Sequence, residues 1–280
     1  MLSLFDTYIS SVLCYGCEVW GFHKSPEIER VHIEYCKRIL NVKTCTLNVM
    51  TYYELGRYPM FVTRKIRIIK YWLKFMNTDN CILNGCYNYL YDMCLKNPND
   101  TNNWVCCVRN ELCRIGLNNL WHAQQSLCKE HLVIIKQRMY DIAKQEFDEI
   151  LHNLYQYLVP TFYIQTYLTK PIPELYKKYI NKMRLSSHNL AIEQGRYYNV
   201  NRNNRNCKFC IDDMEDEMHF ILLCPMYTNL RCNLIKPYYW RKPSVFKLIQ
   251  LFNITNVKQL CNLGKYICRA LKLRADMYTL

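Results

Sequence analysis

Four residues in the C-terminal third of the chain have the types and the spacing of a metal site. Cys207 and Cys210 are separated by two residues, and His219 and Cys224 follow them in the pattern C-x2-C-x8-H-x4-C. Two thiolates from one tight turn can occupy neighbouring corners of a tetrahedron, and a short helix can supply the other two ligands. Zn²⁺ prefers this mixture of sulfur and imidazole, and a site closed by four protein ligands is structural. The spacing predicts a zinc knuckle with a structural Zn²⁺.

A chance grouping of free thiols is the alternative, because the chain contains 17 cysteines. Cys14 and Cys17 also form a C-x2-C pair, but no H-x4-C follows them, so that pair alone is a weak signal. The first twenty residues lack the basic leader and apolar core of a secretion signal. Many cysteines without export are typical of reduced thiols, which favours the nucleus or the cytoplasm as the location.

The overall charge indicates a polyanionic partner. The chain has 280 residues, 50% of them hydrophobic, and a net charge of +14 from 37 basic and 23 acidic residues. This composition is typical of a globular protein that binds RNA or DNA, although a basic surface can also serve solubility alone. No apolar run approaches the roughly 20 residues that span a bilayer. No glycine-rich phosphate-binding motif occurs either.

Helical periodicity dominates residues 1–190, so we expect a mainly α fold. Ser25, Pro26 and Glu27 are typical of a helix start. A core-facing stripe at helical spacing predicts the next helix, with Val62, Ile66, Ile69, Leu73 and Met76. Residues 104–115 read as a helix closed by Gly116, 126–158 as one or two helices, and 174–183 as another.

Two groups of basic residues are candidates for contact with nucleic acid. Arg64, Arg67, Lys70 and Lys74 share another face of the predicted helix, where like charges repel each other unless an anion is present. A merely solvated face is the alternative. The second group precedes the predicted knuckle and mixes basic with aromatic side chains, a combination that suits phosphate contact and base stacking. It comprises Arg196, Tyr197, Tyr198, Arg202, Arg205 and Lys208, with an ordinary polar linker as the alternative.

We expect no catalytic residues in this chain. Asp212 and Asp213 superficially resemble the carboxylate pair that holds Mg²⁺ in polymerases. They lie in the eight-residue spacer between two predicted zinc ligands, and no third carboxylate is available on an earlier strand. The interpretation is a solvated acidic loop, formed with Glu215, Asp216 and Glu217, that would repel phosphate.

Several separate segments resemble LINE-like non-LTR retrotransposon reverse transcriptases, in the order in which that family has them. Residues 13–21 (LCYGCEVWG) resemble a segment downstream of the polymerase palm, 28–42 the family's next helix, and 54–59 (ELGRYP) its E-x-G-R-x-P turn. Residues 184–196 and 215–225 are similar to the segments that lead into and complete a terminal zinc knuckle. The resemblance covers residues 4 to about 232.

The resemblance implies a region that follows the polymerase palm, and therefore a chain without the catalytic aspartates. The expected domains are a helical thumb-like region at 1–185, a basic linker and zinc knuckle at 186–232, and a helical tail at 233–280. The expected function is to hold RNA or DNA while a separate palm does the chemistry. Possible partners are the remaining polymerase and endonuclease domains of the parent element. The alternative is a zinc-stabilised structural adaptor that binds a protein partner.

Overall fold

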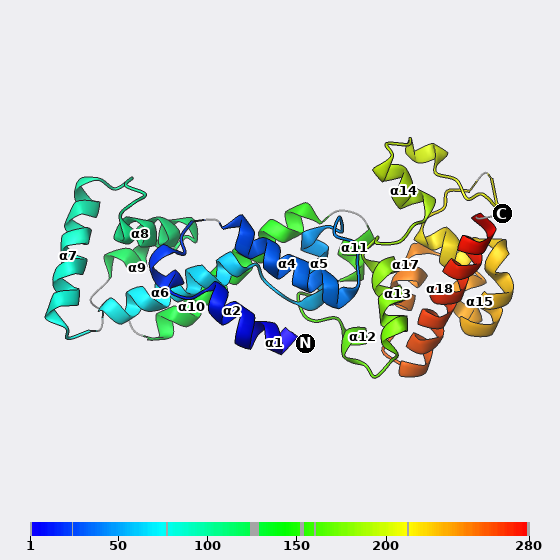
Figure 1. The fold of residues 1–280 in the computed structure, drawn as a ribbon, viewed down its shortest axis with the longest axis horizontal. Helices are drawn as coiled ribbons and strands as arrows, with labels where there is room; N and C mark the ends of the chain where they lie inside the picture. Colours follow the sequence, from blue (N-terminus) through cyan, green and yellow to red (C-terminus); the bar gives the residue numbers. More distant parts are fainter. Residues whose placement is uncertain are drawn as a thin grey trace. The chain divides into compact units, whose positions relative to one another are not determined.

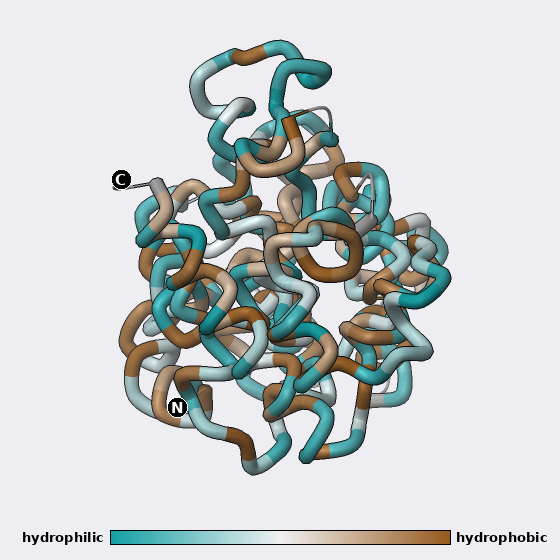
Figure 2. Tube along the Cα trace, turned by 90° about the vertical axis from the view of Figure 1, so that its right-hand side faces the viewer, coloured by the Kyte–Doolittle hydropathy of each residue, from teal (hydrophilic) through white to brown (hydrophobic). Residues whose placement is uncertain are grey.

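The computed structural model describes residues 2–23, 25–76, 78–123, 129–151, 154–159, 161–211 and 213–278 (Figure 1). About 71% of the chain is helical, and the described residues contain no strand. The mainly helical class is therefore confirmed. Hydrophobic and hydrophilic residues alternate along the helices in Figure 2, as expected of helices that bury one face and expose another.

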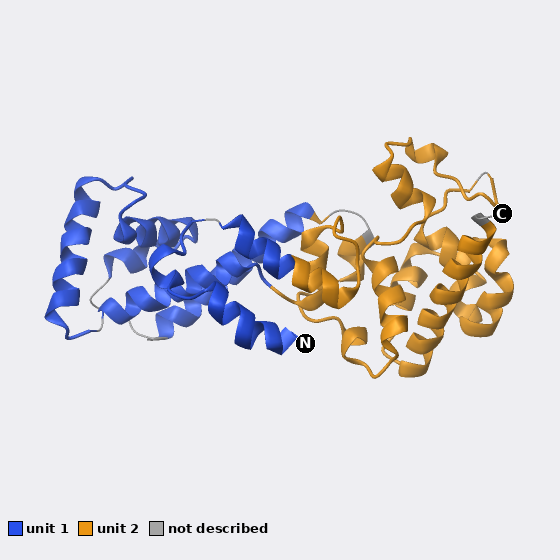
Figure 3. Ribbon diagram, in the orientation of Figure 1, with its two compact units in different colours: residues 1–33, 58–150 blue, residues 34–57, 151–280 orange. Residues whose placement is uncertain are grey.

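The chain divides into two compact units (Figure 3). Unit 1 comprises residues 1–33 and 58–150, and unit 2 comprises 34–57 and 151–280. These units differ from the sequence-based ranges 1–185, 186–232 and 233–280. Residues 34–57 belong with the C-terminal part, and the knuckle and the tail share one unit.

Unit 1 is built around helix α6 (Met60–Met76), which packs against α3 (Cys17–Trp20) and α10 (Lys129–Ile150). The predicted core stripe of α6 is confirmed, because Val62, Ile66, Ile69 and Leu73 are all buried. Trp72 is fully buried as well, and its indole Nε1 donates to the hydroxyl of Tyr87 at 3.1 Å. The other elements of this unit are α1 (Leu2–Leu4), η1 (Phe5–Ile9), α2 (Ser10–Leu13), the first part of α4 (Pro26–Leu40), α7 (Cys81–Lys96), α8 (Trp104–Arg114) and α9 (Asn118–His122).

Unit 2 contains the second part of α4 and most of the shorter helices. Its elements are α5 (Asn48–Leu55), α11 (Leu154–Leu158), α12 (Thr166–Thr169), α13 (Glu174–Arg184), α14 (Ala191–Tyr197), η3 (Arg202–Asn204), η4 (His219–Leu223), η5 (Pro225–Tyr227), α15 (Thr228–Leu234), α16 (Pro237–Trp240), α17 (Val245–Phe252) and α18 (Val257–Tyr278). The predicted helical tail corresponds to α16, α17 and α18.

Helices α13 and α18 form a close pair in unit 2. Gly264 of α18 makes this possible, because a Cβ at that position would lie 2.4 Å from the Cβ of Tyr176 on α13. The absence of a side chain lets the two helix backbones approach each other. The close pair fixes the position of α18, which in turn supports the candidate metal centre.

Candidate metal centre

The four predicted ligands lie together in unit 2. The ligand atoms of Cys207, Cys210, His219 and Cys224 are all within 4.8 Å of one another, and the sulfurs of Cys210 and Cys224 are 3.8 Å apart. Cys207, His219 and Cys224 are buried, and Cys210 is half-buried. Three sulfurs and one imidazole at these distances could hold a metal ion such as Zn²⁺.

The first two ligands come from a tight turn. The amide of Ile211 donates to the carbonyl of Cys207 at 2.8 Å, and the amide of Cys207 donates to the carbonyl of Asp213 at 2.7 Å. An isolated bridge between Asn206 and Met214 closes the base of this turn. Ile211 lies in the left-handed region with φ of 57°, a strained conformation for a β-branched residue. Strain of this kind persists where the surroundings fix the backbone, and here it turns the chain directly after Cys210.

The other two ligands stand at the ends of η4, which is a π-helical turn. The amide of Cys224 donates to the carbonyl of His219 at 2.7 Å, which is the i to i+5 hydrogen bond that defines this geometry. That bond brings residues five positions apart to the same side of the turn. The sequence predicted a short helix for this pair, and the π geometry explains why the spacing is x4 and not the x3 of an α-helical turn.

The side chain of His219 fits the role of a metal ligand. Its Nε2 atom is buried and has no hydrogen-bond partner in the protein, which is unusual for a buried polar atom. Its Nδ1 atom lies 3.8 Å from a carboxylate oxygen of Asp213. A carboxylate at the second ring nitrogen is the usual way in which a ligating histidine is oriented. Burial lowers the pKa of His219, so the imidazole is neutral and its free nitrogen can donate to a metal.

The thiols of the site also respond to burial. Burial raises the pKa of Cys224 to about 12 and raises the pKa of Cys210. Buried thiolates need a cation to stabilise them, and a divalent metal coordinated by the sulfurs deprotonates such thiols outright. The donor set and the orphaned nitrogen of His219 therefore agree on a metal ligand role.

Three buried apolar side chains of η4 and two polar side chains from later helices stabilise this turn. Phe220, Ile221 and Leu222 are buried. Arg231 of α15 donates to the carbonyl of Ile221 at 2.9 Å and to that of Cys224 at 2.7 Å. The hydroxyl of Tyr266 on α18 donates to the carbonyl of Phe220 at 2.9 Å. The carbonyls of the π turn are thus satisfied by side chains from two later helices.

The interpretation of the spacer as a solvated acidic loop is wrong for most of its described residues. Glu215 is 1% exposed and accepts two hydrogen bonds of 2.6 Å from Arg274 of α18. Asp216 accepts from the amide of His219 at 2.7 Å, and Glu217 lies 2.9 Å from the ring of His188. Asp213 is exposed, and Asp212 lies outside the described residues.

The basic segment before the knuckle separates into exposed and structural side chains. Tyr197 and Tyr198 are 77% and 71% exposed, and their rings meet edge to face at 5.2 Å between centroids. Arg196, Arg202 and Lys208 are exposed, and Arg196 also forms an ion pair with Glu193 at 3.1 Å. All of these candidates remain accessible to a ligand.

Arg205 belongs to the structural group. It donates to the carbonyl of Val200 at 3.0 and 2.8 Å and to that of Ile192 at 2.9 Å. Its aliphatic part lies against Gly195, where a Cβ would come within 2.5 Å of it. The prediction of Arg205 as a nucleic-acid contact is corrected on this ground, because its donors hold the loop that enters the metal site.

The basic face predicted on α6 is only partly exposed. Arg64 is fully buried, donates to the carbonyl of His23 at 3.2 Å and the hydroxyl of Ser25 at 3.0 Å, and pairs with Glu29 at 3.4 Å. Its predicted contact with nucleic acid is therefore wrong. Its two terminal nitrogens donate inside unit 1, and the guanidinium lies 5.6 Å from the centroid of the Trp20 ring.

The remaining members of that face differ from Arg64. Arg67 is half-buried and reaches the carbonyl of Cys14 at 3.4 Å, whereas Lys70 and Lys74 are exposed. Cys14 and Cys17 are not part of a metal-binding group among the residues that the structure describes. Of the four basic residues predicted on this face, only Lys70 and Lys74 are exposed.

Sequence reasoning missed a group of basic residues that unit 2 brings together from three separate segments. Lys178 and Lys182 are one helical turn apart on α13, and they line a cavity with Arg38, Lys43 and Lys272. The i, i+4 spacing of Lys178 and Lys182 was visible in the sequence as a local signal. The contributions from α4 and α18 were not.

Comparison with protein-family models, with curated proteins and with solved structures found no match. Among the described helices, none has the length and apolar character needed to cross a membrane.

Proposed function

We propose that this chain binds nucleic acid and that it derives from the region of a LINE-like non-LTR reverse transcriptase that follows the polymerase palm. In this proposal, a structural Zn²⁺ held by Cys207, Cys210, His219 and Cys224 fixes the fold around η4. All four positions around the metal are taken by protein ligands, which leaves no open position for substrate and suits a structural role. The chain contributes binding, and a separate palm contributes catalysis.

The observation that carries the proposal is the pair of exposed tyrosine rings beside exposed arginines on the segment that leads into the cluster. Aromatic side chains of this size are seldom left almost fully exposed side by side, and they offer a surface on which bases can stack. Arg196 and Arg202 flank the pair in sequence and can contact phosphates. Arg205 donates to the carbonyls of Ile192 and Val200, so it holds the end of α14, from which the two rings project.

Fluorescence anisotropy with a labelled single-stranded RNA of mixed sequence tests the proposal. We expect Tyr197→Ala to weaken binding by about 1–3 kcal/mol without a change in salt dependence, because stacking involves no counterion release. Arg202→Gln should instead flatten the plot of log affinity against log salt by about 0.7. Tyr157→Ala is the matched control, because Tyr157 is also an exposed tyrosine of unit 2 but lies outside this segment.

A structural adaptor is the second candidate, and one observation in unit 1 favours it. Several apolar side chains are exposed along the first twenty residues, at Leu4, Tyr8, Val12, Tyr15 and Val19. Exposed apolar side chains that form a contiguous patch are typical of a surface that meets another protein. Absence of RNA and DNA binding by the zinc-loaded chain at low salt would exclude the nucleic-acid proposal and leave the adaptor.

A further inference from the structure

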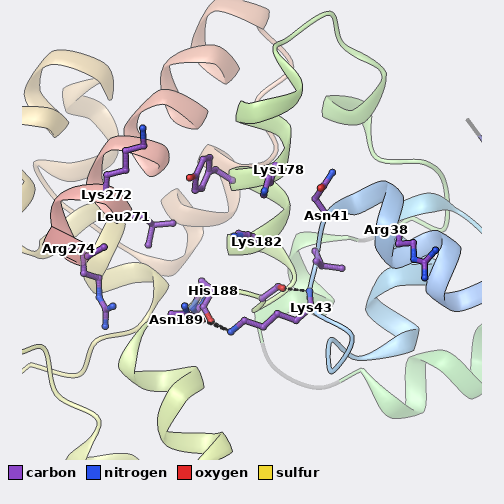
Figure 4. Close-up of a pocket in the computed structure, with 14 residues that line it drawn as sticks. Arg38, Asn41, Lys43, Lys178, Lys182, His188, Asn189, Leu271, Lys272 and Arg274 are labelled. Atoms are coloured by element: carbon purple, nitrogen blue, oxygen red, sulfur yellow. Dashed lines mark hydrogen bonds between the residues drawn. The ribbon is translucent and has the colours of Figure 1, made fainter. Parts of the chain in front are cut away.

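Unit 2 contains a basic cavity of about 780 Å³ that lies apart from the four metal ligands. Figure 4 shows its walls, formed by the end of α4 and the turn after it, by α13 and by α18. Its lining includes six basic side chains and, among the described residues, no aspartate or glutamate. The basic residues are Arg38, Lys43, Lys178, Lys182, Lys272 and Arg274.

Most of this positive charge is not neutralised inside the protein. Arg274 is paired with Glu215, and Arg38 lies 3.9 Å from Glu34 in an exposed and therefore weak ion pair. The four lysines of the cavity form no ion pair with a described carboxylate. Lys43 donates instead to neutral acceptors, the carbonyl of His188 at 2.8 Å and the side-chain oxygen of Asn189 at 2.5 Å.

The fold holds the lysines together by ending two helices at the cavity. After α4, Asn41 takes the left-handed conformation with φ of 54°, and the amide of Val42 donates to the carbonyl of Lys37 at 3.1 Å. After α13, Ser186 has φ of 49°, and the amide of Ser187 donates to the carbonyl of Lys182 at 2.8 Å. Both are the left-handed helix endings that turn a chain sharply.

The two turns are joined directly, because the amide of Lys43 donates to the hydroxyl of Ser187 at 2.8 Å. Lys43 is thereby fixed opposite α13. The side chains of Lys178, Lys182 and Lys272 make none of these hydrogen bonds, so they are not needed to hold the two turns.

Basic residues stabilise the negative C-terminal end of a helix, but this effect explains only some of the basic residues in the cavity. Arg38 and Lys182 lie in the last turns of α4 and α13, where cations stabilise the helix dipole. Lys178 precedes the last turn of α13, and the last turn of α18 has no basic residue at all, so Lys272 stands outside it too. The dipole effect falls off within one turn. Lys178 and Lys272 therefore need another explanation.

The positive charges of the cavity lysines repel one another in the protein without a ligand. Burial, together with the positive charges of Lys178 and Lys43, lowers the pKa of Lys182. An anion in the cavity would remove this repulsion, since it offers the lysines the opposite charge that the described protein groups do not supply.

We propose that this cavity binds the phosphodiester backbone of a nucleic-acid strand through Lys178, Lys182 and Lys272. The inference rests on the proposed nucleic-acid function and adds a second contact region to it. Lysine offers a point charge without the planar fork that reads bases, so these contacts position a strand independently of its sequence. One face of the Tyr179 ring is covered by the ammonium of Lys182 at 5.6 Å.

An acidic protein segment fits the cavity less well. The cores of protein interfaces are depleted in lysine and enriched in aromatic residues, methionine and arginine. Here lysine is the most frequent lining residue, and the aliphatic lining is limited to Val42, Leu271 and Ala275.

The experiment compares the zinc-loaded wild-type chain with the triple variant Lys178→Gln, Lys182→Gln and Lys272→Gln. Lys43 is left unchanged, since its hydrogen bonds hold the loop at 188–189. The probes are labelled single-stranded RNA, inorganic polyphosphate and a polyglutamate peptide, titrated from about 50 to about 200 mM salt. Lys258→Gln is the control, because it removes an exposed lysine from α18 outside the cavity.

We expect the triple variant to bind RNA at least tenfold more weakly at low salt and to flatten the salt slope by about 2, or 0.7 for each lost contact. Polyphosphate binding should fall in parallel, and Lys258→Gln should change neither. Retained zinc content and an unchanged thermal midpoint show that the variant is folded. If it fails these checks, Lys272→Gln alone should still flatten the slope by about 0.7.

The outcomes separate this inference from the proposed function. Unchanged RNA binding by a folded triple variant overturns the cavity assignment and leaves the knuckle segment as the binding region. Tighter binding of polyglutamate than of RNA or polyphosphate, lost in the triple variant, overturns the assignment in favour of an acidic protein. Failure of the wild-type chain to bind RNA or polyphosphate overturns both proposals.

Discussion

The guanidinium of Arg184 donates from Nε to Glu54 Oε1 at 2.6 Å, and both side chains are completely buried in unit 2. The hydroxyls of Tyr155 and Tyr167 donate to the same carboxylate at 2.7 and 2.5 Å. Arg184 also donates to the carbonyl of Phe252 at 3.0 Å. Both residues of the pair lie in segments on which the proposed retrotransposon origin rests, 54–59 and 184–196, so the pair joins two of these segments.

Glu54→Gln should destabilise the chain strongly. Burial lowers the pKa of Arg184, and the carboxylate of Glu54 together with the neighbouring tyrosines more than offsets this and raises it. Because the ordinary pKa of arginine is above about 12, the guanidinium stays charged when Glu54 is lost. An uncompensated buried charge costs about 3–5 kcal/mol of unfolding free energy, to be measured by urea unfolding. Glu174→Gln is the control, because Glu174 forms an exposed pair with Lys177 and should change stability by less than about 1 kcal/mol. Similar losses of unfolding free energy in both variants would show that the buried pair contributes no more to stability than the pair of Glu174 with Lys177.

The purified chain should contain about one Zn²⁺, and Cys210→Ser should lose most of it. The cysteine is half-buried and its sulfur lies 3.8 Å from that of Cys224, so the substitution removes a ligand with little loss of packing. Metal analysis by mass spectrometry measures the content. Cys232→Ser is the control, because Cys232 is an exposed cysteine of α15 outside the cluster. Equal zinc content in all three proteins would refute the ligand assignment.

Glu111 should make the stability of the chain depend on pH in the acid range. Burial raises its pKa, but Arg114 and Lys65, at 2.8 Å each, outweigh burial and lower the pKa below its ordinary value of 4.5. Because the folded pKa is the lower one, the ionised group stabilises the fold above the unfolded pKa. This contribution is lost as pH falls through the folded value.

Urea midpoints of the wild type and of Glu111→Gln, measured from neutral pH downward, test this dependence. The variant should be less stable at neutral pH, and the difference should shrink once the pH drops below the ordinary glutamate range. Glu146, which lies 3.4 Å from Arg114 and is half exposed, provides the control variant Glu146→Gln with a small effect. A difference that stays constant down to low pH would contradict the lowered pKa.

Lys70 and Lys74 are the members of the predicted basic face of α6 that can contact a ligand. Neutralising both to glutamine should leave the thermal midpoint unchanged, since surface substitutions rarely alter stability by more than about 0.5 kcal/mol. If each lysine binds a phosphate, the salt slope for single-stranded RNA should fall by about 1.4. An unchanged slope would confine binding to unit 2. Arg64→Gln should instead lower the thermal midpoint, because it removes the ion pair of the half-buried Glu29 and the hydrogen bonds of a fully buried guanidinium.

The local features of this protein were predictable because their signals are local. The core stripe of α6, the start of α4 at Pro26 and the end of α8 before Gly116 each depend on residues within a few positions. Gly116 has φ of 72°, in keeping with the glycine that ends a helix. The four candidate metal ligands belong to the same category, since their spacing alone singled out the residues that the fold brings together.

The errors concern residues whose partners are distant in sequence. Arg64 was assigned to an exposed face because its pairing with Glu29, 35 residues earlier, cannot be read from the periodicity of α6. Glu215 was assigned to a solvated loop because its partner Arg274 comes 59 residues later. The basic cavity was missed for the same reason, since three separate segments contribute to it. A charge in the sequence says nothing by itself about whether it faces water.

The pairing of Glu215 with Arg274 means that the segment of the predicted knuckle cannot keep its structure without the rest of unit 2. The residues from Cys207 to Cys224 contain every metal ligand, yet a synthetic peptide of that length would leave the carboxylate of Glu215 and the backbone of η4 without Arg274, Tyr266 and Arg231. Grafting the short segment onto another protein should therefore transfer the ligands without their geometry. To transplant the site, both α15 and α18 would have to be moved with it.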